Sequence, residues 1–135
     1  MKKLTLVLLV LLIWLSSACQ PQSAPEAEDA FCQSLADFNQ TLQPLTEINA
    51  SSDREQIKTD LETAQQAWLD VQEAGQEMRE ANLSNLELAV TNLGKTIQAA
   101  LGVASLEDSL AGIQKALGDV QTALAELQKV NCSTP

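Results

Sequence analysis

The chain has 135 residues, with eight Lys and Arg against eighteen Asp and Glu, a formal net charge of −10, and neither His nor Tyr. Such an acidic chain is repelled by nucleic acid and by anionic headgroups, so we expect direct contact with neither. Because histidine is the usual proton shuttle and a common metal ligand, its absence argues against an enzyme. We therefore expect no catalytic residue, no metal site and no cofactor.

Residues 1–18 have the pattern of a cleaved secretory signal peptide. Lys2 and Lys3 form a short basic start, residues 4–15 are apolar apart from Thr5, and small residues follow at 16–18. The apolar run is well short of the roughly 20 residues that span a bilayer, and the whole pattern is typical of an export signal. Its removal would leave six basic against eighteen acidic residues, a formal charge of −12.

Cys19 stands directly after this segment, and Leu15-Ser16-Ser17-Ala18-Cys19 resembles a bacterial lipobox, in which small residues precede a cysteine. The leucine usual three residues before the cysteine is Ser16 here, and Leu15 stands one place earlier. The resemblance implies that the Cys19 thiol is acylated and becomes the mature N-terminus. The alternative is ordinary signal-peptidase cleavage after Ala18, which would leave a free thiol at Cys19.

The lipobox resemblance also implies a location for the mature chain. It would be an exported lipoprotein, anchored by lipid on the outer side of the cytoplasmic membrane or in the periplasm. Residues 19–25 are polar and contain proline, a composition that suits a lipidated tether. Residues 26–135 then form a single domain by length.

Cys32 and Cys132 remain as an even pair once Cys19 is assigned to lipid. Exported chains form disulfides readily. A bridge closing about 100 residues stabilises a fold by roughly 4–5 kcal/mol if it acts on the entropy of the unfolded chain. Two separate thiols are the alternative, because spacing alone does not establish a pairing.

Four segments carry apolar residues at alternating spacings of three and four, which predicts amphipathic helices. The first begins near Pro25 or Glu26 and weakens at Pro44. Capping-box patterns open the other three, and they are Ser52 with Glu55, Ser84 with Glu87, and Ser105 with Asp108. Gly75 is expected to kink or end the second helix. Gly102 follows the third helix, where a left-handed residue is favoured.

The apolar positions of these helices define their expected core faces. They are Phe31, Leu35, Phe38, Leu42 and Leu45 in the first; Ile57, Leu61, Ala64, Trp68, Val71 and Met78 in the second; Leu86, Val90, Leu93, Ile97 and Leu101 in the third; Leu106, Leu110, Ile113, Leu117, Val120, Leu124 and Leu127 in the fourth. The last series is a heptad pattern, which either faces inward or joins two chains. The oligomeric state therefore stays open.

No segment has a strand pattern, so we expect an all-α fold, an antiparallel up-and-down four-helix bundle with short connections. In such a bundle the first helix starts where the last one ends, which independently places Cys32 beside Cys132. Because the second and fourth helices look longer than the others, the alternative is three long helices with an N-terminal arm.

Trp68 is the residue most open to a functional interpretation. We expect its ring in the core, and the alternative is that it lines an apolar pocket that holds a ligand or contacts a partner. Leu83 and Leu88 lie off the third apolar face. We expect both to extend the core, and the alternative is a small exposed patch for a partner.

From Phe31-Cys32-Gln33-Ser34-Leu35 to Asn131-Cys132, the chain resembles small exported bacterial helical lipoproteins of unknown function. The resemblance lies in a cysteine opening the first helix, Trp68 in the second, and a cysteine ending the last. It implies a secreted bundle and no catalytic residue. We expect a lipid-anchored, non-catalytic interaction module that binds another envelope protein. The alternative is a protein that holds a small apolar ligand between helices near Trp68.

Overall fold

The computed structural model describes residues 23–78 and 81–132, so the expected signal peptide and Cys19 lie outside the described residues. The described residues form no strand and contain four long helices, which are α2 (Ala24–Thr46), α3 (Arg54–Gln76), α4 (Ser84–Leu101) and α5 (Leu110–Asn131). A short 3-10 helix, η2 (Glu107–Ser109), leads directly into α5.

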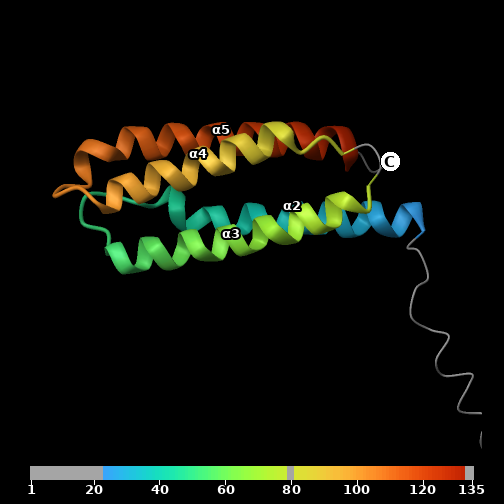
Figure 1. Cartoon of the computed structure of the whole chain (residues 1–135), viewed down its shortest axis with the longest axis horizontal. Coiled ribbons are helices and arrows are strands. Elements are labelled where there is room, and N and C mark those ends of the chain that lie inside the picture. Colours follow the sequence, from blue (N-terminus) through green and yellow to red (C-terminus); the bar gives the residue numbers. More distant parts are fainter. Residues whose placement is uncertain (1–22, 79–80, 133–135) are drawn as a thin grey trace, which may run out of the picture.

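Successive helices run in opposite directions along one bundle (Figure 1). α2 packs along α3 and α4 along α5, while α2 and α5 join the two pairs; the contact between α3 and α4 is the lightest of these. The all-α four-helix bundle is therefore confirmed. The alternative with an N-terminal arm is wrong, because α2 and α3 are equally long at 23 residues each.

The bundle has two distinct ends (Figure 1). We call the end that holds the start of α2 and the end of α5 the terminal end. The opposite end, which holds the connections 47–53 and 102–109, is the distal end. Any tether that precedes α2 therefore attaches to the terminal end.

The core is built from the apolar faces predicted for the four helices. Every expected core residue of the first helix is buried, as are Ile57 to Val71 of the second series and most of the third and fourth. The half-buried exceptions pack against the same core, and they are Met78, Val90, Leu101 and Leu110. Burial of this apolar surface is the main term that stabilises the bundle.

Helix α2 begins at Ala24, slightly before the expected start at Pro25 or Glu26. The backbone N–H and the hydroxyl of Ser23 both donate to the Glu26 carboxylate, at 3.0 and 2.8 Å. The Ser23 hydroxyl, followed by its backbone N–H, lowers the pKa of Glu26, because both hydrogen bonds favour the charged carboxylate. Pro44 lies inside the last turn, and α2 continues to Thr46.

The N-terminal cap of α3 is Asp53 rather than the expected Ser52. The Asp53 carboxylate accepts a hydrogen bond from the Glu55 backbone N–H at 2.8 Å. Ser52 has another role, since its hydroxyl oxygen accepts from the Asn49 backbone N–H at 2.9 Å. Ser52 thus closes the preceding turn, and the adjacent aspartate supplies the cap.

Helix α3 ends one residue after Gly75, at Gln76, so the glycine is near the end of the helix and not at a kink within it. Gly75 is buried, and a Cβ at this position would lie 2.8 Å from Leu83 Cδ1 and 3.4 Å from Phe31 Cε2. Leu83, expected in the core, is half-buried and packs against it. The missing side chain therefore makes room for the return of the chain into α4.

Two expectations at the ends of α4 are wrong. The expected Ser84–Glu87 capping box does not form at its start. Instead, the Asn82 side chain accepts a hydrogen bond from the Ser84 backbone N–H at 3.1 Å. At its other end Gly102 has φ −85° and ψ −11°, which is right-handed rather than left-handed. Its N–H reaches carbonyls of the last helical turn, so no left-handed residue is required.

The expected Ser105–Asp108 cap is also wrong in detail. The Ser105 hydroxyl accepts from the Glu107 backbone N–H at 3.3 Å, and the chain first forms the 3-10 turn η2. Helix α5 follows at Leu110. Tighter 3-10 turns are common at helix starts, so the helical stretch begins near the predicted place.

Arg54 joins the start of α3 to the end of α4 at the distal end. Its Nη1 donates to the carbonyl oxygens of Ala100 and Leu101, at 3.2 and 2.8 Å, and its Nη2 donates to that of Ala104 at 3.2 Å. Carbonyls in the last turn of a helix lack partners within the helix, and α4 has no basic residue of its own there. The guanidinium supplies both the hydrogen bonds and the favourable charge.

Replacing Arg54 by Met should lower the free energy of unfolding by about 1–2 kcal/mol, because the apolar stem stays while the donors are lost. Urea unfolding would measure the difference. Arg54→Lys is the matched control, which keeps the charge without the planar fork, and we expect an intermediate loss. Equal free energies of unfolding for all three proteins would show that the hydrogen bonds of Arg54 do not stabilise the fold.

Candidate functional site

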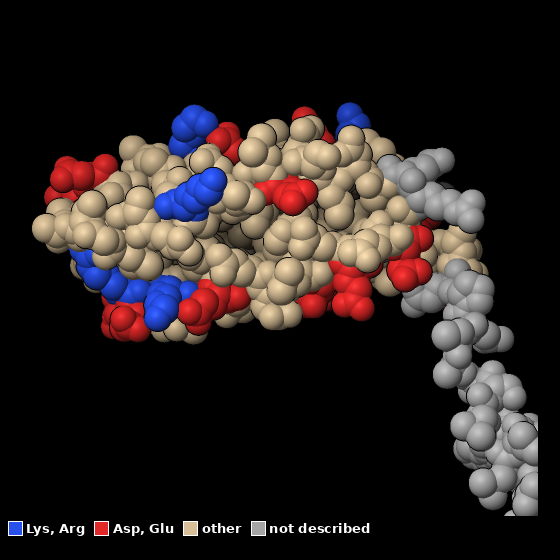
Figure 2. All heavy atoms as spheres, viewed as in Figure 1, with Lys and Arg blue, Asp and Glu red and all other residues tan. Residues whose placement is uncertain are grey.

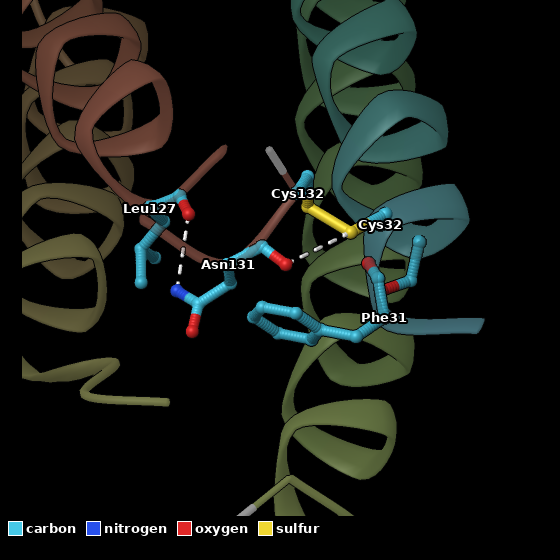
Figure 3. Close-up of a disulfide and its surroundings, with 6 residues drawn as sticks. Phe31, Cys32, Leu127, Asn131 and Cys132 are labelled. Carbon is cyan, nitrogen blue, oxygen red and sulfur yellow. Dashed lines mark hydrogen bonds between the residues drawn. A yellow bond between two sulfur atoms is a disulfide. The ribbon is translucent and has the colours of Figure 1, made fainter. Parts of the chain in front are cut away.

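Cys32 and Cys132 are joined by a disulfide, with their Cα atoms 5.6 Å apart and 100 positions between them in the sequence. Figure 3 shows the bridge between α2 and the residue that follows α5. The Asn131 carbonyl oxygen lies 3.7 Å from Cys32 Sγ, and the Asn131 side chain donates to the Leu127 carbonyl at 3.0 Å. The bridge therefore fixes the last turn of α5 to the first part of α2.

Trp68 lies in the core, as expected, with 7% of its surface exposed. Its ring centroid is 5.9 Å from that of Phe38, and the two rings are tilted by 51°. The pair therefore contributes to the contact between α2 and α3. The surface hollows described below are lined by other residues, so Trp68 belongs to the packing of the bundle.

Leu88 is 72% exposed, which makes the expectation that it extends the core wrong. It lies two residues after the buried Leu86, and two helical steps of about 100° carry it to the opposite side of α4. The alternative, an exposed patch of Leu83 and Leu88, holds for Leu88 alone, because Leu83 packs against the core. On α5, Val130 is also exposed, at 77%, and lies beyond the apolar series that the sequence predicts for this helix.

A hollow of about 530 Å³ lies beside Leu88, between α4 and α5. A second hollow, of about 180 Å³, adjoins Val130 and shares Asn85, Ala123 and Glu126 with the first. We call the two together the α4–α5 groove. Its α4 wall runs from Asn85 to Lys95, and its α5 wall runs from Asp119 to Asn131. Small side chains make the groove, because Ala89 and Ala123 leave space that a larger residue would fill.

The charged side chains of the α4–α5 groove differ from one end to the other. Lys95 and Asp119 line its distal part, and Lys115 pairs with Asp119 at 2.8 Å. Glu126 lines the part nearer the terminal end. Within residues 23–78 and 81–132, neither Lys95 nor Glu126 forms an ion pair. The groove therefore offers an uncompensated cation toward one end and an uncompensated anion toward the other.

The charges over one whole face show a similar division (Figure 2). Most of its Lys and Arg side chains lie toward the distal end, while acidic side chains dominate near the terminal end. This arrangement favours a basic partner close to the terminal end.

No helix in the described ranges is both long and apolar enough to cross a membrane. The same ranges bring together no group of three or more Cys, Asp or Glu side chains that could hold a metal ion. Every buried side-chain nitrogen or oxygen described there has a hydrogen-bond partner.

Comparison of the chain with protein-family models, with curated proteins and with solved structures finds no match. The resemblance to small exported bacterial lipoproteins stays a prediction from the sequence pattern.

Proposed function

We propose that the protein is a lipid-anchored, non-catalytic interaction module of the bacterial cell envelope, and that it binds another envelope protein through the α4–α5 groove. The observation that carries the proposal is the pair of large aliphatic side chains, Leu88 and Val130, exposed beside a continuous hollow. A contiguous exposed apolar patch with a polar rim is typical of sites that bind other proteins, and we infer that Leu88 and Val130 form such a patch together with the hollow between them.

The sequence pattern supports the anchor in this proposal. Cys19 stands five positions before Ala24, where α2 begins, so an acyl group at Cys19 would hold the terminal end close to the membrane. The proposal does not extend to an apolar ligand beside Trp68. That alternative stays a prediction, but the contact of Trp68 with Phe38 describes a packed core rather than an open pocket.

The anchor is tested by the mass of the chain extracted gently from its own membranes without reductant. We expect a chain that starts at Cys19, heavier by acyl groups and lighter by the two hydrogens lost in the Cys32–Cys132 bridge. Acylation of an exported cysteine would account for membrane attachment without a basic patch. A chain of the same length without lipid would refute the anchored module.

The binding face is tested by hydrogen–deuterium exchange of the chain in its own membranes and after purification in detergent. A bound partner should slow amide exchange in peptides that cover residues 85–95 and 119–131 in the membranes. Peptides from α3 that include Leu69, which is 53% exposed, are the internal control and should exchange equally in both samples. Equal exchange along α4 and α5 in the two samples would contradict binding through this groove.

A further inference from the structure

The α4–α5 groove has the dimensions of a site for one helix. Its walls, Asn85 to Lys95 and Asp119 to Asn131, each span about ten residues, or about 15 Å along a helix axis. A helix laid between two antiparallel helices contacts both through residues on one face. An amphipathic helix with a narrow apolar stripe would cover Leu88 and Val130 together.

The charges of the groove indicate which end of the bound helix should be basic and which acidic. Glu126 favours basic side chains on the part of the partner near the terminal end. Lys95, farther toward the distal end, favours an acidic side chain there. The expected partner helix is therefore basic at one end of its contact and acidic at the other.

The short link before α2 limits the distance between the groove and the membrane. From Cys19 to Ala24 an extended chain reaches about 17 Å, and from Ala24 to Cys32 the helix rises by about 12 Å. The disulfide places Cys132 level with Cys32. Asp119, at the far end of the groove, lies about 20 Å along α5 from Cys132. The whole groove therefore lies within about 50 Å of the anchored lipid.

A second copy of the chain does not satisfy these constraints. Contact between Lys95 of one copy and Glu126 of another requires the two bundles to be antiparallel, which would direct their tethers away from each other. Two upright copies anchored in one membrane would instead be parallel, and Lys95 would then approach its own equivalent. Like charges opposed in this way disfavour the pairing.

We propose that the α4–α5 groove binds an amphipathic helix that continues from a transmembrane segment of an integral membrane protein, with basic side chains near the membrane and an acidic one farther from it. The inference rests on the proposed function, since the limit on distance applies only to an acylated chain. A helix that leaves the bilayer directly reaches about 50 Å within a little over 30 residues. The lipid anchor holds both proteins at one surface, which raises their effective concentration.

The test uses the full-length chain in its own membranes, with a photoreactive phenylalanine analogue at one position at a time. Leu88 and Val130 report on the groove, and Leu69 on α3 is the matched control because it is also an exposed aliphatic side chain. We expect adducts from positions 88 and 130 at least tenfold more abundant than from position 69. Mass mapping should place the attached residue within about 30 residues of a transmembrane segment.

The expected contact of Glu126 with basic side chains of the partner is tested in the same experiment with Glu126→Lys. This change should lower the yield of the adduct from position 88 at least fivefold, since it removes the anion expected to meet basic side chains. Glu62→Lys on α3 changes the net charge equally at another exposed position, and we expect the yield to stay unchanged. Equal effects of the two substitutions would contradict the assigned polarity.

One kind of outcome would overturn the inference while leaving the proposed function in place. It is an adduct from positions 88 and 130 with an envelope protein that has no transmembrane segment, or with a residue far from one. Adducts with a second copy of the chain, equal yields from Leu69 and Leu88, or no adduct from the groove would overturn both the inference and binding of another protein through the groove. A membrane-extracted chain without acyl groups would refute the lipid anchor itself.

Discussion

Replacing Cys32 and Cys132 together by Ala should lower the free energy of unfolding by about 4 kcal/mol. The bridge closes a loop across 100 positions, and a cross-link of this length restricts the unfolded chain strongly. It also holds α2 against α5, the contact that joins the two helix pairs. Urea unfolding of residues 19–135, followed by Trp68 fluorescence, would measure the loss.

Reduction of the unsubstituted protein is the control for this change, because it opens the same loop without altering the side chains around it. We expect reduced protein and the double variant to unfold at the same urea concentration. The explanation would be falsified if the double variant unfolded within about 1 kcal/mol of the oxidised protein, because loop closure predicts a larger difference.

The core of the bundle could be predicted because burial follows the helical period. Phe31, Leu35 and Phe38 recur at spacings that return to the same side of α2, and all three are buried. The same rule could have placed Leu88 correctly, since it lies on the side opposite Leu86. Val130 is harder to place, because its position three residues after the buried Leu127 fits the inward pattern while the side chain is exposed.

The helix ends were less predictable because neighbouring polar residues compete for the same backbone groups. Ser52 and Asp53 are both good N-terminal caps, and the choice between them depends on the Asn49 turn, in which Ser52 takes part. No sequence pattern near Arg54 indicates its role, because the carbonyl groups that it contacts lie 46 to 50 positions later in the sequence. Such contacts follow from the bundle topology, which brings the start of α3 to the end of α4.

The candidate site could be predicted only in part from the sequence, because the groove also depends on contacts between distant residues. The pairing of Cys32 with Cys132 followed from an up-and-down topology, in which both fall at one end. A groove instead depends on which small side chains face each other across two helices. Ala89 and Ala123 carry no pattern that distinguishes them from other alanines, and only the packing of α4 on α5 brings them to one hollow.

Phe38→Ala should lower the free energy of unfolding by about 3–5 kcal/mol, because it removes a fully buried ring and leaves a cavity that the bundle fills only in part. Phe38 is 1% exposed, and its ring contacts Trp68 across α2 and α3. The loss should therefore appear in two measurements on residues 19–135. The urea midpoint should fall, and the native emission of Trp68 should move to longer wavelength as its surroundings loosen.

Gln40→Ala is the matched control, since it shortens an exposed side chain on the same helix. We expect its free energy of unfolding to change by less than about 0.5 kcal/mol. Phe38→Leu should lose less than Phe38→Ala, because the leucine side chain fills part of the same volume. If Phe38→Ala lost no more stability than Gln40→Ala, the contact between the two rings would not belong to the core of the folded protein. Trp68 would then be open to the ligand-binding alternative, and an emission shift on adding lipids extracted from the same membranes would test it.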